Sequence, residues 1–429
     1  MPVLAQFQAG VGSGVITPDL GKHGPVYIAG FSQNRRATGV HDDLYARCMA
    51  LQLVRRPLVL CGVDSIGLFL DDVKKIRERL GERVVVSSTH DHEAPDTLGL
   101  WGPDRATTGI QEAYNEFVIE RTVQAAREAI RNLKPARIKL AKTADAELDT
   151  FIHDTRPPVR HDSELVLMLA EEVNGNPIGV LVNWANHPET LGSKNTLITS
   201  DYAGFLRARL EELAGGTAVF INGAVGGMQS PLGAKLEQPE NSFERANHIG
   251  RRVAELGAAA LRGAPVAAVD QITFREKTIQ VPVANVNFQL AGKANLFAGR
   301  KNMGTENVMT SVVGYIRLSN GEGPVLEIAT IPGEMYPELS VGGIERYSGA
   351  DFPDAPLEPP IKQQMKAPFR MLFGLANDEM GYIIPKAEWD QTAPWLKDAT
   401  KRWYGEVNSP GPEAAPMINN AFADLIKEK

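Results

Sequence analysis

Short apolar runs alternate with amphipathic helical patterns along this 429-residue chain. The helical patterns carry apolar residues at three- and four-residue spacing, over residues 71–80, 110–133, 201–213 and 243–261. Between them lie β-branched or aliphatic runs of strand length, over residues 57–63, 84–88, 138–141, 165–170, 179–183, 218–222 and 325–331. This alternation predicts an α/β fold in which mixed β-sheets are flanked by helices, rather than an all-β or all-α fold.

The composition is that of a globular protein with a substantial core, since 43% of the residues are hydrophobic and 23% are charged. The net charge of −7 comes without long Lys/Arg runs, so we expect no binding to nucleic acid or to an anionic membrane surface. Cys48 and Cys61 are the only cysteines, too few for a disulfide framework or for a cysteine-based metal site.

The first residues have neither the basic region nor the apolar stretch of a signal peptide. The most apolar window, residues 57–70, carries Asp64 and is too short to span a bilayer, so we expect no stable membrane insertion. The chain as written is therefore expected to be cytoplasmic, or secreted if a signal was removed. Within one large domain, residues 265–320 differ from the rest, with a strand-like run at 279–286 and a helix-like run at 290–298. They are a possible lid or sub-domain insertion.

A β-branched run ends in a pair of histidines at Val84-Val-Val-Ser-Ser-Thr-His-Asp-His92. If strand geometry continues to the end of this run, His90 and His92 project from the same face, because side chains alternate with period two. Two imidazoles presented together suit a transition metal, and zinc is the usual partner of histidine with carboxylate. The motif alone is equally compatible with a polar loop whose histidines only cap it or face solvent.

Two further polar side chains follow strand-like runs. His187 ends Asn183-Trp-Ala-Asn-His187, and Glu334 ends Pro332-Gly-Glu334. Sites of α/β folds lie beyond the ends of strands. Each residue taken singly is more typical of a hydrogen-bonded or solvated side chain. Two histidines and a glutamate from three strand ends, however, match catalytic zinc sites that keep a position open for water or substrate.

Seven motifs follow one another along nearly the whole chain: Gly10-Val-Gly-Ser-Gly-Val-Ile-Thr-Pro18, Gly39-Val-His-Asp-Asp-Leu-Tyr-Ala-Arg47, Ser88-Thr-His-Asp-His-Glu-Ala-Pro95, Asn183-Trp-Ala-Asn-His187, Phe220-Ile-Asn-Gly223, Pro332-Gly-Glu334 and Gly374-Leu-Ala-Asn377. In this order they resemble the neutral/alkaline (non-lysosomal) ceramidase family. The resemblance implies a ceramidase-like zinc hydrolase domain over residues 1–429 that acts on a small-molecule substrate.

The resemblance also implies roles for particular residues. The family's second histidine of the pair contacts the reacting carbonyl and falls on His92. Its substrate-binding arginine falls on Arg156, in Asp154-Thr-Arg156, and a further tyrosine of that site falls on Tyr404. Its four zinc ligands fall on His90, His187, Glu334 and Tyr382.

The chain departs from the family pattern in two places. Family members carry a serine nucleophile in an Asn-Gly-Asp-x-Ser-Pro motif, whereas this chain reads Asn222-Gly-Ala-Val-Gly-Gly-Met-Gln-Ser-Pro231. In ungapped register Ala224 replaces the aspartate and Gly226 replaces the serine, and only a four-residue insertion would bring Ser230 into register. The family's C-terminal immunoglobulin-like module is also not expected here. Both departures predict that ceramide is a poor substrate and that a smaller, more polar amide or ester is preferred.

Without the serine, the expected nucleophile is a metal-activated water, because zinc lowers the pKa of bound water to about 7. His92 and Arg156 would stabilise the oxyanion. Glu93 is either the general base or a hydrogen-bond partner of a ligand imidazole, and Asp96 is expected to play the second role. Two alternatives stay open: a metal-dependent hydrolase of a glycosidic or phosphoester bond, and a catalytically silent ligand-binding homologue.

Overall fold

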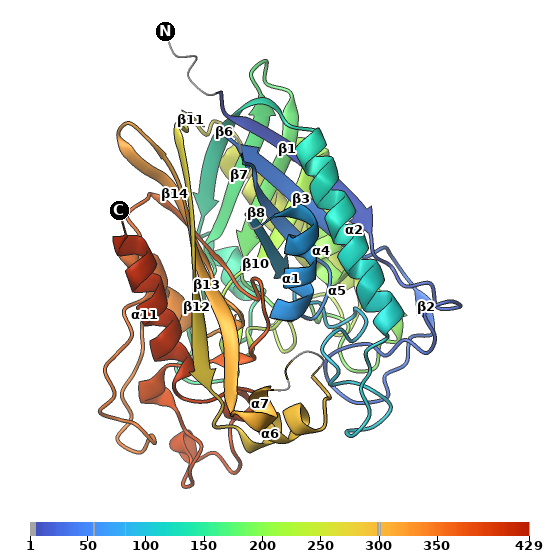
Figure 1. Cartoon of the computed structure of the whole chain (residues 1–429), viewed down its shortest axis with the longest axis vertical. Coiled ribbons are helices and arrows are strands. Elements are labelled where there is room, and N and C mark those ends of the chain that lie inside the picture. Colours follow the sequence, from blue (N-terminus) through green and yellow to red (C-terminus); the bar gives the residue numbers. More distant parts are fainter. Residues whose placement is uncertain (1–5, 55, 82, 298–299, 301, 429) are drawn as a thin grey trace.

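The chain folds into two main β-sheets whose outer faces are covered by helices (Figure 1). This mixed α/β architecture confirms the expected fold class. The computed structural model describes all residues except 1–5, 55, 82, 298–299, 301 and 429.

The larger sheet has nine strands in the order β10-β8-β7-β6-β1-β3-β4-β5, with β11 paired to β6. All neighbours are antiparallel except β8–β10 and β4–β5, which are parallel. Only two residue pairs join β1 to β6, at the point where one half of the sheet meets the other. The strands are β1 (Gln8–Val15), β3 (Tyr45–Gln52), β4 (Leu58–Val63), β5 (Val84–Ser88), β6 (Lys134–Thr143), β7 (Leu165–Glu172), β8 (Pro177–Trp184), β10 (Thr217–Asn222) and β11 (Val266–Ala267).

The second sheet contains β12 (Gln271–Pro282), β13 (Val308–Asn320), β14 (Gly323–Thr330) and β16 (Phe369–Phe373), in that order. The strand-like run at 279–286 is the end of β12, which begins earlier and stops at Pro282. The helix-like run at 290–298 overlaps α6 (Val286–Lys293), and its last residue, Ala298, lies outside the described residues. Both α6 and α7 (Asn302–Thr305) lie between β12 and β13 in sequence, at one end of the molecule (Figure 1).

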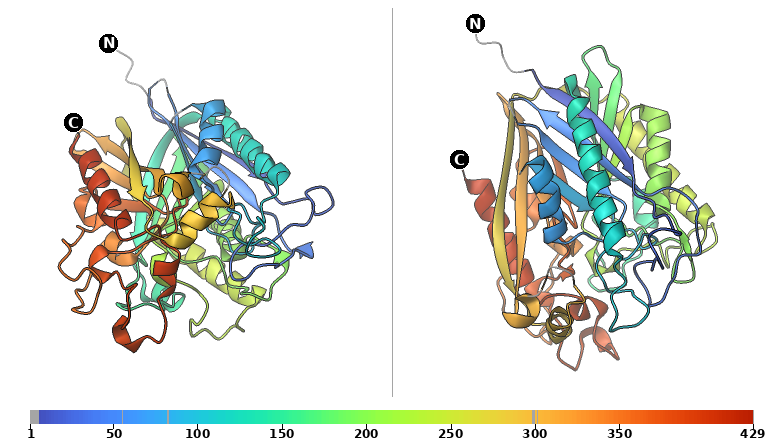
Figure 2. Two further views of the ribbon diagram at one scale, coloured as in Figure 1. Left: turned by 60° about the horizontal axis from the view of Figure 1, so that its bottom comes forward. Right: turned by 45° about the vertical axis from the view of Figure 1, so that its right-hand side comes forward.

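Four long helices confirm the predicted helical segments to within two residues at each end: α1 (Leu70–Leu80), α2 (Glu112–Arg131), α4 (Asp201–Ala214) and α5 (Phe243–Leu261). Helices α1 and α2 cover the β3–β4 half of the large sheet, and α4 and α5 cover the β7–β8–β10 half (Figures 1 and 2). The glycines of β1 explain the close approach of α2. A Cβ on Gly12 would lie 2.1 Å from the carbonyl oxygen of Ala125, so no larger residue fits there.

The central core lies between the sheets. One buried cluster contains Leu60 and Val85 from one half of the large sheet, Ile221 from the other half, and Ile328 and Phe373 from the second sheet. Strands buried on both faces read as continuous apolar runs, which is why they were recognisable in the sequence. Helix α11 (Ala414–Lys427) packs on the other face of the second sheet, against β12 and β13 (Figure 1).

The remaining elements are short. They are β2 (Gly39–Val40), β9 (Leu197–Ile198), β15 (Glu334–Met335), β17 (Tyr382–Ile383), α3 (Ala146–Thr150), α8 (Pro337–Val341), α9 (Ile361–Gln364) and α10 (Tyr404–Val407), with three 3₁₀ turns at Gly226–Met228, Lys386–Glu388 and Leu396–Asp398. Strand β2 pairs with β9 and β15 pairs with β17.

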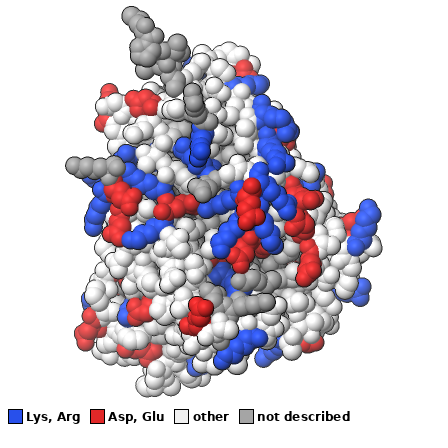
Figure 3. Space-filling view, viewed as in Figure 1, with Lys and Arg blue, Asp and Glu red and all other residues white. Residues whose placement is uncertain are grey.

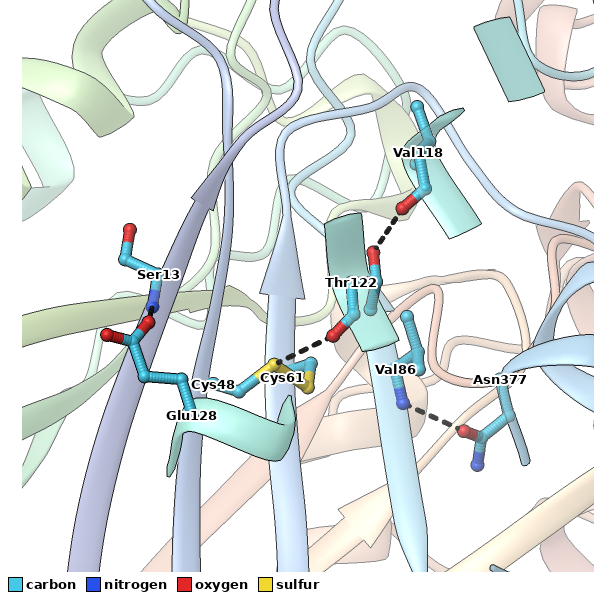
Figure 4. Close-up of a disulfide and its surroundings, with 8 residues drawn as sticks. All are labelled: Ser13, Cys48, Cys61, Val86, Val118, Thr122, Glu128 and Asn377. Carbon is cyan, nitrogen blue, oxygen red and sulfur yellow. Dashed lines mark hydrogen bonds between the residues drawn. A yellow bond between two sulfur atoms is a disulfide. The ribbon is translucent and has the colours of Figure 1, made fainter. Parts of the chain in front are cut away.

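The two cysteines face each other across the antiparallel β3–β4 ladder and form a disulfide, buried close to Thr122 of α2 (Figure 4). Within the described residues, no helix combines the length and apolarity needed to cross a bilayer. On the face shown in Figure 3, basic and acidic side chains are interspersed. That face therefore offers no broad basic patch.

Candidate active site

The candidate site lies where several strands end. Strand β5 ends at Ser88, just before His90, and β8 ends at Trp184, just before His187. Asn222, the last residue of β10, ties the two loops together. Its side-chain amide donates to the carbonyls of Thr89 and Asn186, both at 2.8 Å, and its oxygen accepts the amide of Asn186 at 3.2 Å. The two histidines are thus carried on loops anchored to one buried side chain.

The three histidines His90, His92 and His187 meet in space. Their ring centroids lie 4.8 to 5.4 Å apart, and one nitrogen from each lies within 4.8 Å of the others, so together they could bind a metal ion. Strand alternation is not the reason for this meeting. The strand stops at Ser88, and His90 adopts a left-handed backbone with φ of 65°. A tight turn, rather than continued strand geometry, brings His90 and His92 together.

Glu334 joins this cluster from the other side. Its Oε2 lies 3.2 Å from Nε2 of His187 and 3.3 Å from Nε2 of His90. In the parallel β15–β17 ladder Glu334 stands directly opposite Tyr382, and the two side chains are hydrogen-bonded. The structure thus brings together the four residues expected to hold the metal.

The loop that precedes Tyr382 is fixed to β5. The backbone amide of Asn377 donates to the carbonyl of Val86 at 2.6 Å, and the amide of Val86 donates to the Asn377 side-chain oxygen at 3.0 Å (Figure 4). This explains the Gly374-Leu-Ala-Asn377 motif, whose last residue attaches the Tyr382 segment to the strand that leads to His90.

The histidines are oriented as metal-binding histidines usually are. Nδ1 of His90 lies 2.7 Å from the carbonyl oxygen of Ile66, and Nδ1 of His187 lies 2.7 Å from that of Gln229. A carbonyl can only accept, so each Nδ1 carries a proton, and each Nε2, beside Glu334, is the nitrogen available to a metal ion. Ligand atoms at the corners of a zinc tetrahedron with bonds of about 2.1 Å lie about 3.4 Å apart, close to the spacing seen here. The donor set therefore fits such an ion.

The electrostatics reflect this crowding of opposite charges. Burial alone would raise the pKa of Glu334, but His90 and His187 hold it well below its ordinary value. Burial opposes the charged form of His187, whereas the Glu334 carboxylate raises its pKa. The pKa of His92 is far below its ordinary value, because the ring is buried and its neighbours are also histidines.

Sequence reasoning missed Glu189, which is almost completely buried beside His92. Its Oε2 lies 3.4 Å from Nδ1 of His92, and its Oε1 accepts the hydroxyl of Ser230. Burial raises the pKa of this carboxyl above its ordinary value. The only sequence clue was its place two residues after His187, because carboxylates so often support metal-binding histidines.

Glu93 and Asp96 make different contacts from those expected. Glu93 accepts hydrogen bonds from Arg35 at 3.1 Å and from Asn195 at 2.7 Å, and burial raises its pKa to about 8. Arg35 in turn donates to the carbonyl of His92, so Glu93 reaches the site through Arg35. Asp96 accepts backbone amides at 2.7 to 2.9 Å from the loop that follows it, at Leu98, Gly99 and Trp101.

Arg156 and Tyr404 reach the site through tyrosine rings that contact Tyr382. Arg156 donates to Glu406 at 2.6 Å and to the carbonyl of Glu388 at 2.8 Å, and its guanidinium lies 5.0 Å from the ring of Tyr336. The ring of Tyr336 contacts Tyr382 edge-on, with centroids 5.9 Å apart. Tyr404 contacts Tyr382 in the same way at 5.8 Å and is 56% exposed, so its side chain is accessible from solvent.

Comparison with known proteins places this geometry in context. Neutral ceramidases of Drosophila melanogaster and Drosophila pseudoobscura pseudoobscura are each 23% identical to the chain, over 233 and 231 residues. A crystal structure of neutral ceramidase from Pseudomonas aeruginosa superposes with a TM-score of 0.73 at 15% identity, covering 98% of this chain and 74% of that one. This chain shares the fold of neutral ceramidase and resembles the Drosophila enzymes in sequence over about half of its length.

The family resemblance read from the seven motifs is thereby confirmed. A structure described as ceramidase complexed with C2 also has a TM-score of 0.73, at 16% identity over 98% of this chain and 75% of that one. The aligned segments cover 49% and 48% of this chain but only 33% and 32% of the two Drosophila proteins, so the chain spans about a third of their length. No family model matches the chain.

Proposed function

We propose that this chain is a metal-dependent hydrolase of amide bonds, with esters as the nearest alternative, and that the metal is zinc. The observation that carries the proposal is the meeting of the Glu334 carboxylate with the Nε2 atoms of His90 and His187. A backbone carbonyl fixes each histidine from behind. The relatives named neutral ceramidases support an amide over other bonds.

In this proposal His90, His187, Glu334 and Tyr382 hold the ion. When bound, zinc would polarise the substrate carbonyl and lower the pKa of a coordinated water. His92 faces the same space from the next turn of the loop, and the exposed ring of Tyr404 borders it on the solvent side. Arg156 is met by two glutamates, so we propose that it supports Tyr336 rather than the oxyanion.

We further propose that water is the nucleophile. Gly226 has no hydroxyl, and its backbone packs against Glu334 and Met335. Ser230 is 3% exposed and donates its hydroxyl to Glu189. Accordingly, Ser230→Ala is expected to retain most activity, and mass spectrometry should detect no acyl-enzyme during turnover. An inactive Ser230→Ala variant with a trapped acyl-enzyme in the wild type would contradict this.

The test of the function combines metal content with a substrate panel. The purified protein is expected to hold one zinc per chain and to cleave chromogenic amides faster than glycosides or phosphates, with long-chain ceramide a poor substrate. His187→Ala should lose both metal and activity, because it removes one ligand. His248→Ala is the matched control, since this histidine belongs to helix α5, where its ring packs against Phe151.

Each contrary result has a distinct meaning. A protein without stoichiometric metal would refute the metal centre. Turnover of glycosides or phosphates alone would refute the bond class. Full metal occupancy without turnover of any substrate would favour a ligand-binding homologue.

A further inference from the structure

Glu189 is held in a fixed position between His92 and Ser230. The amide of His92 donates to the carbonyl of Pro188 at 2.9 Å, which places the two segments side by side. On the other side, Ser230 forms a backbone bridge with His153, through hydrogen bonds of 2.7 and 3.1 Å. The carboxylate therefore meets a hydroxyl and an imidazole whose backbones are both anchored.

The Ser230 hydroxyl already has two hydrogen-bond partners. Its hydroxyl oxygen accepts the amide of Leu232 at 3.0 Å, and its proton is donated to Glu189. One carboxylate oxygen is thereby occupied, and the other lies 3.4 Å from Nδ1 of His92, an ion-pair distance without hydrogen-bond geometry. A negatively charged oxygen at this distance favours a proton on Nδ1 by electrostatic attraction.

We propose that Glu189 is a positioning residue that fixes the tautomer and orientation of His92, which rests on the proposed function above. A neutral imidazole carries one proton, and Glu189 keeps it on Nδ1. Nε2 of His92 is then left without a proton. Its ring lies 4.8 Å from that of His90 and 5.4 Å from that of His187, at the candidate centre.

This tautomer changes what His92 can do. An unprotonated Nε2 accepts hydrogen bonds and cannot donate one to a carbonyl oxygen. His92 therefore orients a water or a substrate N–H, rather than donating to the oxyanion as the family resemblance implies. Ser230 is the anchor of Glu189 in this arrangement, not a nucleophile activated by it.

The first test needs no turnover. In metal-free, ¹⁵N-labelled protein at pH 8, long-range ¹H–¹⁵N spectra of histidine side chains distinguish the two tautomers, and His92→Asn assigns the signals. We expect Nδ1–H for His92 in the wild type. Glu189→Gln should shift the population toward Nε2–H, because the glutamine amide can donate to Nδ1. Glu171→Gln, at the far end of the β7–β8 pair, is the matched control and should leave the signals unchanged.

The second test uses zinc-loaded protein on the best amide of the panel. Glu189→Gln should lower kcat by about 10- to 100-fold, as loss of a partner of a site histidine does, and leave KM within about twofold. Glu189→Asp keeps the charge but withdraws the carboxylate by one carbon, so it should be intermediate in both tests. Glu189→Asp also provides both tests if Glu189→Gln does not fold.

Two outcomes would overturn the inference. One is a Glu189→Gln variant with unchanged His92 signals. The other is loss of all activity in Ser230→Ala with the His92 tautomer intact, which would make Ser230 the nucleophile and Glu189 its base. Failure of the wild type to cleave any amide would instead refute the proposed function, because the tautomer is measured without substrate or metal.

Discussion

Space around Gly226 decides what residue that position accepts. A Cβ there would lie 2.4 Å from Cδ1 of Tyr336 and 2.7 Å from both the carbonyl oxygen of Glu334 and the carbonyl carbon of Met335. Two of these three atoms belong to the backbone of β15, so a side-chain rotation cannot relieve the contact. The segment that presents Glu334 to the histidines therefore packs directly against a residue without a side chain.

Restoring a serine at this position should damage the site rather than supply a nucleophile. Gly226→Ser is expected to cost about 1–3 kcal/mol of unfolding free energy, typical of overpacking a dense interior. It should also weaken zinc binding, since Glu334 has to move. Urea unfolding and zinc competition with a chelator measure the two effects. Gly321→Ser is the control, because a Cβ there meets only Asp270, at 4.0 Å. A serine variant as stable as the wild type would contradict the prediction.

The residues found from the sequence were those with a motif around them. His90, His187 and Glu334 each end an apolar run, and the structure brings all three together. Glu189 has no such mark, because its role depends on a serine 41 residues away and on a histidine in another loop. The left-handed turn at His90 was also beyond the sequence, since its residue type does not require it.

At the scale of elements, the site depends on how strand ends are tied to one another. Asn222 ends β10 and joins the loops after β5 and β8 with both donors of its side chain. Asn183 plays a similar part in β8, where its amide donates to the carbonyls of Ile221 and Leu372, both at 2.9 Å. These two buried asparagine side chains, each with several hydrogen-bond partners, thus tie neighbouring strands together next to the loops that carry the histidines.

Asn222→Asp keeps the shape of the side chain but removes both donors. The carbonyls of Thr89 and Asn186 then face a carboxylate oxygen instead of an N–H, inside a dry core. We expect a loss of about 2–4 kcal/mol in stability, because buried acceptors are left unpaired, and about 10- to 100-fold weaker zinc binding. Asn174→Asp, in the exposed β7–β8 turn, is the control. Unchanged metal affinity in Asn222→Asp would show that the loops after β5 and β8 keep their positions without the hydrogen bonds of Asn222.

Elements were predictable where one face was clearly apolar. Helix α5 was predicted with its observed ends, Phe243 and Leu261. Strand β12 was recognised only at its end, because its first seven residues include Arg275, Glu276 and Lys277 and none of these seven residues is buried. Charged residues are common on edge strands, where they prevent pairing with other chains, and β12 is an edge of its sheet. Its pattern therefore lacks the alternation that marks a strand.

For the molecule as a whole, the buried Cys48–Cys61 disulfide bears on where the protein works. Disulfides are rare in cytosolic proteins, so the redox state of this cysteine pair is a property to measure directly. We expect no thiol to react with a maleimide when the protein is denatured without reductant. Replacing both cysteines by alanine should cost about 2–4 kcal/mol of stability. Two reactive thiols in freshly purified protein would contradict the pairing.

The stability of the whole molecule should also depend on pH through the buried carboxyls of Glu338 and Glu388, near Arg156. Burial and the nearby Glu388 raise the pKa of Glu338 to about 8, and burial raises that of Glu388 to about 7. In an unfolded chain a glutamate titrates near about 4.3. The folded state therefore binds these protons more tightly, so their contribution to stability is complete below about pH 4 and is lost as the pH rises to about 8.

Glu338→Gln removes one of these titrations while keeping the shape of the side chain. The wild type should lose more unfolding free energy than the variant between pH 5 and pH 8, with a difference on the order of 1 kcal/mol or more. Urea unfolding at several pH values, with metal held in excess, measures both slopes. Glu322→Gln, on the exposed β13–β14 turn, should follow the wild type. Equal slopes for wild type and Glu338→Gln would mean that Glu338 is already ionised in the folded protein at neutral pH, where the positive charge of Arg156 favours its ionised form.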